Sequence, residues 1–178
     1  GWLDLQEHGV SPADVVMGIA ASGGTPYVVG ALSKCREAGI TTGCITCNAG
    51  SAVTQVADFP VEVVVGPEFV TGSTRMKSGT AQKMVLNMLS TASMIRLGKV
   101  YENMMVDLQL KSHKLTERAK KILMTVLNIS YGEAEQLLDS ANGNVKIAIV
   151  MKKKNITKPK ALLLLKKANG FVRKAIEK

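Results

Sequence analysis

The stretch Asp14-Val-Val-Met-Gly-Ile-Ala-Ala-Ser-Gly-Gly-Thr-Pro26 decides the fold class. Its first half is an apolar run without polar alternation, which is typical of a strand buried on both faces of a parallel sheet. A turn, Ser22-Gly-Gly-Thr25, comes next. Thr25 suits a helix N-cap, and Pro26 suits the first helical position. The sequence therefore predicts a strand that leads through a short turn directly into a helix.

The residues that follow repeat this alternation. We expect the helix to run to about Ala38 and to end at Gly39. Two more strands are predicted over 41–47 and 61–65, with a short helix over 52–57 between them. Strands that alternate with helices form parallel sheets flanked by helices, so we predict an α/β fold. Three strands make a small sheet for such a fold. We therefore expect the chain to begin partway through a domain.

Charge and helical pattern change along the chain. A long apolar-rich helix is predicted from Ser73 to about Leu97, and we expect it to be buried or to face a partner subunit. The net charge of the 178 residues is +9. Residues 1–110 carry seven basic and nine acidic side chains, whereas residues 111–178 carry sixteen and five. We predict an α/β part over 1–110 and a small all-helical module over 111–178.

Composition and cysteine spacing exclude several classes of protein. Hydrophobic residues make up 46%, but no apolar run approaches the ~18 residues of a membrane span. The first residues lack the pattern of a signal peptide, and we expect a cytoplasmic protein. Cys44 and Cys47 form a C-x-x-C on a predicted strand, where residues three apart face opposite sides. No second cysteine or histidine pair completes a metal site, since His8 and His113 are isolated. We expect reduced, mostly buried thiols and no metal.

The turn Ser22–Thr25 has the chemistry of an anion site. The first turn of a helix presents free backbone N–H groups and a positive dipole end. The glycines allow close backbone approach, and the two hydroxyls can donate to phosphate oxygens. The turn lacks the G-K-[ST] ending of a nucleotide P-loop and is not G-x-G-x-x-G, so we do not expect a dinucleotide. An ordinary strand–helix turn with a cap fits the same residues equally well.

A second polar stretch, Gly66–Lys83, combines an acid, several hydroxyl residues and cations just ahead of the apolar helix. This mixture suits a pocket for an anionic, hydroxyl-rich ligand. Glu68 lies near Arg75 and two lysines, so it is a candidate for a shifted pKa. An ion pair with Arg75 or a helix cap is the alternative for this glutamate.

The motifs together resemble N-acetylmuramic acid 6-phosphate etherases, a family with the sugar isomerase (SIS) fold. The resemblance rests on Gly18-Ile-Ala-Ala-Ser-Gly-Gly-Thr-Pro-Tyr27, on Gly66–Lys83, on Asn87-Met-Leu-Ser-Thr91 and on Gly98-Lys-Val-Tyr101. The long motif is shared with the glucokinase regulatory protein. The similarity covers essentially the whole chain but only the later part of the family's length.

The resemblance implies a site and a reaction. The family cleaves the D-lactyl ether of N-acetylmuramate 6-phosphate by elimination and water addition, giving N-acetylglucosamine 6-phosphate and D-lactate. It needs no metal and no redox cofactor. Many members have Arg at the position of Gly24, which could contact the phosphate. The implied sugar-phosphate loop is Ser22, Gly23, Gly24 and Thr25, and the implied pocket wall is Glu68, Thr71, Ser73, Thr74, Arg75 and Lys77.

The family's two catalytic glutamates have no counterpart in residues 1–178, so the resemblance places them upstream of Gly1 and implies that this chain alone is inactive. In related isomerases a glutamate at the position of Glu68 takes part in proton transfer. A non-catalytic sugar-phosphate-binding module and a sugar-phosphate isomerase are the alternatives.

The resemblance also implies a homodimer, a role in peptidoglycan recycling, and a helical module like a ubiquitin-associated domain with a packing or dimer role. The C-terminal helices are rich in lysine, which raises the question of nucleic-acid binding. Aromatic residues make up only 4% of the chain, and no recognition motif is present, so the sequence argues against nucleic acid as a partner.

Overall fold

The computed structural model describes residues 1–177. These residues form two compact units, Gly1–Leu89 and a second unit that begins at Ser90. The division lies earlier in the chain than the change in charge near residue 111. The domain limits 1–110 and 111–178 therefore stay a prediction. Each unit is described by itself below.

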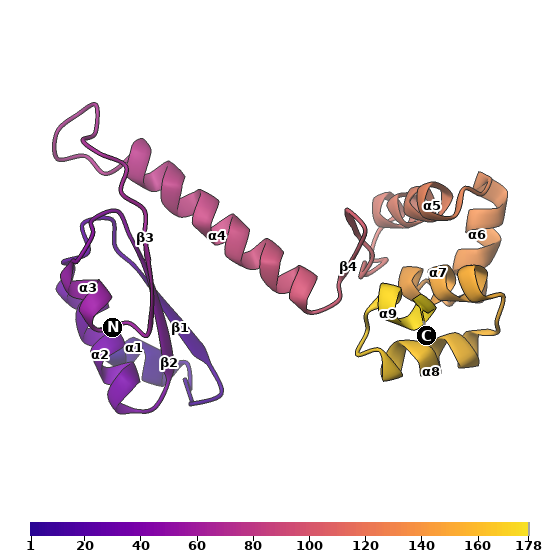
Figure 1. Ribbon diagram of the computed structural model, residues 1–178, viewed down its shortest axis with the longest axis horizontal. Helices are drawn as coiled ribbons and strands as arrows, with labels where there is room; N and C mark the ends of the chain where they lie inside the picture. Colours follow the sequence, from indigo (N-terminus) through magenta and orange to yellow (C-terminus); the bar gives the residue numbers. More distant parts are fainter. Residues whose placement is uncertain (178) are drawn as a thin grey trace. The chain divides into compact units, whose positions relative to one another are not determined.

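The first unit contains a three-stranded parallel sheet in the order β1-β2-β3 (Figure 1). Val15 pairs with Thr41, and Gly43 pairs with Phe59. The predicted α/β class is thereby confirmed. The strand bounds are β1 Val15–Ile19, β2 Thr41–Thr46 and β3 Phe59–Glu62. The third strand begins and ends earlier than predicted, because its pairing with β2 extends over Phe59 and Pro60.

Helices cover one face of this sheet. A core cluster of Leu32, Cys44, Val53 and Ala57 joins α2 and α3 to β2. Thr25 is the N-cap of α2 and a proline occupies its first turn, as predicted. The helix bounds are α1 Trp2–Glu7, α2 Pro26–Glu37 and α3 Ala52–Gln55.

The opposite face of the sheet is exposed along its two outer strands, while Ile45 of the central strand is buried. Val15 and Phe59 are each 65% exposed, and Ile19 is 40% exposed. These side chains alternate with the residues that face α2 and α3, so they point away from both helices. The prediction that the first strand is buried on both faces is therefore wrong for this chain.

The long helix α4, Lys77–Arg96, begins four residues later than predicted. Ser78 is its only buried residue, while Met84 and Met88 are 58% and 66% exposed. The expectation that this helix is buried is thus wrong within residues 1–177. The alternative, that it faces a partner subunit, stays a prediction.

The second unit is mainly helical. Its core includes Leu123, Leu138, Ile149 and Val172, all at most 2% exposed. The helix bounds are α5 His113–Leu127, α6 Tyr131–Ser140, α7 Val145–Lys154, α8 Lys158–Lys167 and α9 Val172–Glu177. The predicted helical C-terminal part is confirmed. No helix among the described residues is long and apolar enough to cross a membrane.

Of two local features of this unit, the sequence predicted one and not the other. The capping box predicted at Ser130 and Glu133 is present, with reciprocal side-chain and backbone hydrogen bonds. The antiparallel hairpin β4 Val100–Tyr101 with β5 Met104–Met105 was not predicted. Its turn uses Glu102 at a positive φ of 54°, without a glycine to signal it.

Lys120 belongs to α5, and only 9% of its side chain is exposed. Its ammonium lies 3.0 Å from Glu117, 2.5 Å from Glu135 and 2.9 Å from the hydroxyl of Tyr131. These partners, Glu135 foremost, raise the pKa of Lys120 well above its usual range. The buried charge is therefore compensated, as buried charges must be.

Candidate functional site

Three segments meet where the parallel strands end. They are the loop after β1 (residues 20–25), the loop after β2 (residues 47–51) and the first turn of α4. The carboxyl ends of parallel strands share one edge of a sheet, and ligands of open α/β sheets bind there. The thiol of Cys47 lies 3.9 Å from the carbonyl oxygen of Ser78, which brings α4 next to the end of β2. We call this region the carboxyl-edge site.

The loop after β1 is held through its carbonyl groups. The carbonyl of Ala21 accepts from the backbone N–H of Cys47 at 3.0 Å and from the side-chain amide of Asn48 at 3.3 Å. The same amide donates to the carbonyl of Ser22 at 3.2 Å. The carbonyl of Gly23 accepts from the backbone N–H of Val53 at 2.8 Å. The loop after β2 and the start of α3 thus fix three consecutive carbonyls of the loop after β1.

Gly23 fits this arrangement because it has no side chain. Its φ is +72°, and a Cβ there would lie 2.0 Å from Oγ of Ser51 and 2.8 Å from Oγ1 of Thr46. Gly24 is different, since a Cβ on it would meet no atom within 4 Å. Thr25 is an exposed N-cap whose hydroxyl makes no capping bond, so this hydroxyl is available to a ligand.

Glu68 caps helix α4. Its carboxylate accepts from the backbone N–H of Lys77 and from that of Ser78, each at 3.0 Å. These two bonds, that of Lys77 first, hold the pKa of Glu68 below its usual value. Of the possibilities that the sequence left open, the cap is the arrangement present. Because the cap supplies partners at Lys77 and Ser78, the helix begins there and not at Ser73.

The cap predicts a pH-dependent stability difference for Glu68→Gln. Since the pKa is lower in the folded protein than the ordinary 4.5, the charged cap stabilises the fold above that value. The contribution is lost as the pH falls through the folded pKa. At pH 7 we expect Glu68→Gln to unfold at a lower urea concentration than the wild type. At pH 3 we expect the two unfolding midpoints to be nearly equal. Urea titrations across this range measure the difference, and a gap that is independent of pH would contradict the charged cap.

The remaining predicted wall residues lie between Glu68 and α4. Thr71, Thr74 and Arg75 are exposed, and Ser73 is half-buried. Within residues 1–177 no carboxylate lies within 4.0 Å of Arg75, and no hydrogen bond joins these four residues to the loop after β1. The exposed side chain of Lys77 donates to the carbonyl of Pro67 at 2.8 Å. The structure therefore brings Glu68 and Lys77 together and leaves the others as an open surface.

Sequence reasoning missed the residues of the loop after β2. Asn48 holds the loop after β1, Ser51 lies close to Gly23 and within 3.4 Å of the hydroxyl of Thr46, and the backbone N–H of Gly50 donates to the carboxylate of Glu62 at 2.8 Å. The sequence indicated only a polar loop here. Their place could have been inferred, because this loop follows the strand that pairs with β1.

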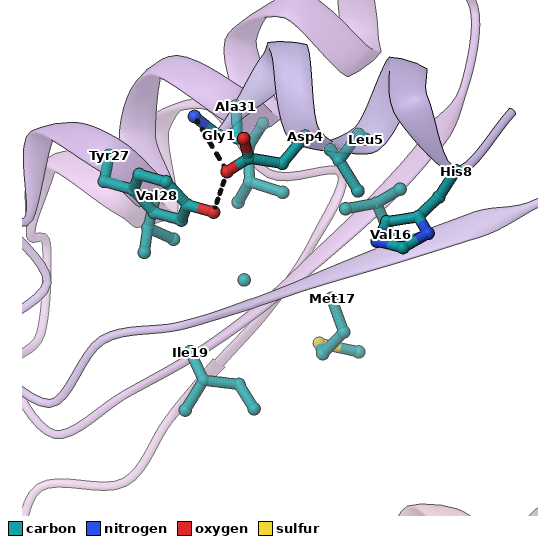
Figure 2. A pocket seen from close by; sticks show the side chains of 12 residues that line it. Gly1, Asp4, Leu5, His8, Val16, Met17, Ile19, Tyr27, Val28 and Ala31 are labelled. Carbon is teal, nitrogen blue, oxygen red and sulfur yellow. Dashed lines mark hydrogen bonds and ion pairs between the residues drawn. The ribbon is translucent and has the colours of Figure 1, made fainter. Parts of the chain in front are cut away.

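A separate cavity of about 410 Å³ lies between α1, β1 and α2. Figure 2 shows the carboxylate of Asp4 directed at the hydroxyl of Tyr27, and the two oxygens are 2.5 Å apart. This hydrogen bond raises the pKa of Tyr27. Most other lining side chains are apolar, and none of the predicted site residues lines this cavity. It is therefore not the site indicated by the motifs.

The three cysteines are buried and not in disulfides, which confirms the expected free, buried thiols. Burial raises the pKa of Cys35 and of Cys44. Within residues 1–177 no group of three or more His, Cys, Asp or Glu side chains is placed to hold a metal ion.

Comparison with known proteins assigns the α/β part of the chain. Residues 6–92 match the family model of the SIS domain. The matched stretch includes the sheet, all three segments of the carboxyl-edge site and most of α4.

Two curated relatives match nearly the whole chain. The chain is 53% identical over 174 residues to N-acetylmuramic acid 6-phosphate etherase of Geobacillus sp. (strain WCH70), covering 98% of this chain and 59% of that protein. It is 51% identical over 177 residues to the protein of the same name from Bacillus subtilis (strain 168), covering 99% and 58%. These relatives confirm the resemblance indicated by the motifs. The chain spans about three fifths of the length of the curated relatives it matches.

Among solved structures, a crystal structure of a hypothetical protein is similar with a TM-score of 0.40 and 20% identity. The match covers 49% of this chain and 50% of that one.

Proposed function

We propose that this chain is the later part of an N-acetylmuramic acid 6-phosphate etherase and binds the phosphorylated amino sugar at the carboxyl-edge site. The observation that carries the proposal is the identity of about half of all residues to proteins of that name, over nearly the whole chain. The SIS domain and the polar carboxyl edge of its sheet support the same assignment.

We assign the phosphate to the loop Ser22–Thr25. Two helix N-termini lie at the carboxyl-edge site, and such ends attract anions. That of α4 is already occupied by the carboxylate of Glu68. The N-terminus of α2 has no carboxylate of its own, and its Thr25 hydroxyl is unused as a cap. Thr71, Ser73, Thr74, Arg75 and Lys77 would then line the sugar side of the pocket.

The proposed reaction needs one base and one acid. The base removes the proton at C2 of the sugar, the C3–O bond breaks, and the acid protonates the departing D-lactate oxygen. Water then adds across the C2–C3 double bond to give N-acetylglucosamine 6-phosphate. Glu68 stays ionised at neutral pH and accepts two backbone hydrogen bonds, so it does not suit the acid. This argues against Glu68 as the acid only; following the resemblance, we propose that both the acid and the base lie in sequence upstream of Gly1.

Other parts of the proposal concern the whole protein. We propose a cytoplasmic homodimer that acts in peptidoglycan recycling, and the exposed apolar side chains of α4, such as Met84 and Met88, support a partner surface there. We also propose that residues 111–178 form a module that packs against other parts of the assembly and does not bind nucleic acid.

A lactate assay tests the proposed function. We expect the full-length gene product to release D-lactate from N-acetylmuramate 6-phosphate and this 178-residue chain to release none. The physical reason is that the chain holds binding residues without an acid–base pair. Lactate from the chain alone would place the catalytic pair within it. No lactate from the longer protein, but binding of the sugar phosphate, would favour a non-catalytic binding module. Interconversion of ketose and aldose phosphates would favour an isomerase.

A further inference from the structure

We propose that Asn48 is the positioning residue of the phosphate loop, an inference that rests on the proposed function. Asn48 lies in the loop after β2, twenty-two residues beyond the start of α2, yet its side chain holds the loop after β1. The bound group in this proposal is the phosphate of a phosphorylated sugar. Asn48 does not touch the phosphate but sets the direction of the backbone groups that do.

The side-chain amide of Asn48 contacts two consecutive carbonyl groups. Its nitrogen donates to the oxygen of Ala21 at 3.3 Å and to that of Ser22 at 3.2 Å. Only the NH₂ end of the amide can make both bonds, because the oxygen end would face two acceptors. The orientation of the Asn48 amide is therefore fixed by its partners. The backbone N–H of Asn48 donates to Oγ1 of Thr46 at 3.3 Å, which anchors the residue itself.

These bonds orient N–H groups as well as carbonyls. In a trans peptide the N–H points opposite to the C=O of the preceding residue, and the described residues contain no cis peptide. The carbonyls of Ala21 and Gly23 are directed at the loop after β2 and at Val53. The N–H groups of Ser22 and Gly24 therefore point away from these partners, on the exposed side of the loop. There the N–H of Gly24 donates to Oγ of Ser22 at 3.5 Å, a long bond that an anion would replace in this proposal.

The middle peptide is held from both ends. The carbonyl of Ser22 accepts from Asn48, and the N–H of Gly23 donates to the carbonyl of Ala20 at 3.0 Å. Without Asn48 the Ser22 carbonyl would lose this partner, and the peptide would be held through the N–H of Gly23 alone. The carbonyls of Ala21 and Gly23 would keep the backbone N–H groups of Cys47 and Val53, so we expect the loop to loosen in its middle and to hold the outward N–H groups of Ser22 and Gly24 less firmly toward a phosphate. A preorganised loop avoids this ordering cost when the anion binds.

The test compares binding of N-acetylglucosamine 6-phosphate with binding of unphosphorylated N-acetylglucosamine, by calorimetry on the full-length protein. We expect Asn48→Ala to lower the affinity for the phosphorylated sugar about tenfold, as the loss of one to two net hydrogen bonds would. Asn48→Asp keeps the shape but replaces the donor with a carboxylate that repels both the carbonyls and the phosphate, so we expect a loss of about thirtyfold or more. Affinity for the unphosphorylated sugar should stay unchanged.

Two further variants make the result specific. Asn103→Asp makes the same chemical change at an exposed turn between β4 and β5 and should leave both affinities unchanged. Asn48→Gln keeps the donor amide on a longer stem and should recover part of the affinity. In the lactate assay, we expect KM to rise in the Asn48 variants by a larger factor than kcat falls.

The outcomes separate the two proposals. If the wild-type protein does not prefer the phosphorylated sugar, the proposed function itself fails. If it does, and Asn48→Asp and Asn48→Ala bind the phosphorylated sugar as the wild type does, only the role of Asn48 is overturned. Equal losses for both sugars would show a general structural role and would also overturn it. Should Asn48→Asp fail to fold, Asn48→Gln and Asn48→Ala decide by the same comparison.

Discussion

Gly23→Ala is expected to destabilise the first unit, Gly1–Leu89, by roughly 2–5 kcal/mol and to abolish its binding of a sugar phosphate. The added Cβ would lie 2.0 Å from Oγ of Ser51, so the two loops of the carboxyl-edge site would have to separate. Overpacking of this kind costs about 1–3 kcal/mol. A non-glycine residue at the φ of +72° adds about 1–2 kcal/mol. Urea unfolding of this unit, with calorimetry of N-acetylglucosamine 6-phosphate, measures both effects.

Gly24→Ala is the matched control. It adds the same methyl group one residue further on, where no atom lies within 4 Å and φ is not positive. We expect its unfolding free energy to lie within about 0.5 kcal/mol of the wild type, as for ordinary surface substitutions. Equal effects of the two variants would show that the close contact between Gly23 and Ser51 is absent in solution. Ser51→Gly should recover part of the loss in a Gly23→Ala background.

Leu123→Ala is expected to destabilise the helical unit by about 2–5 kcal/mol. Leu123 lies on α5, is 0% exposed, and belongs to the core that α5 shares with α6 and α7. Removal of its isobutyl group loses transfer free energy and leaves a cavity that the surrounding helices fill only in part. Hydrogen exchange of the amides in α5–α7, measured with increasing denaturant, reports this loss.

Leu162→Ala is the same chemical change at a position on α8 where the side chain is 55% exposed. We expect a change within about 0.5 kcal/mol. If Leu123→Ala were equally mild, the packing around Leu123 would be looser than the structure shows. If Leu162→Ala were as severe, its side chain would be covered in solution by another surface.

The fold class could be predicted because local signals agree with each other. Thr25 and Pro26 start α2, and Ser130 with Glu133 starts α6, where the sequence placed these starts. Side-chain caps and proline geometry act over a few residues, so they can be read from sequence alone. The bounds of β3 and the exposure of Val15 could not be predicted, because they depend on which neighbours each strand face meets.

The residues of the candidate site also fall into those that sequence alone could indicate and those that it could not. The turn Ser22–Thr25 was recognisable because its glycines and hydroxyl residues are contiguous. Asn48 was not singled out, because its role comes from a contact twenty-six residues away in sequence, with Ser22. The start of α4 was misplaced for a related reason. The residue that caps it, Glu68, lies nine residues before Lys77, beyond the spacing of an ordinary N-cap.

The bond between Glu68 and the first turn of α4 has a kinetic consequence. The segment from Glu68 to Lys77 is closed at both ends by the same pair of hydrogen bonds. Its residues therefore cannot swing outward without exposing two amides of the helix at the same time. The segment Glu68–Lys77 and the first turn of α4 should open as one cooperative unit, so their backbone amides should share a single rate of hydrogen exchange. Movement of this part of the pocket wall is thereby coupled to fraying of a helix.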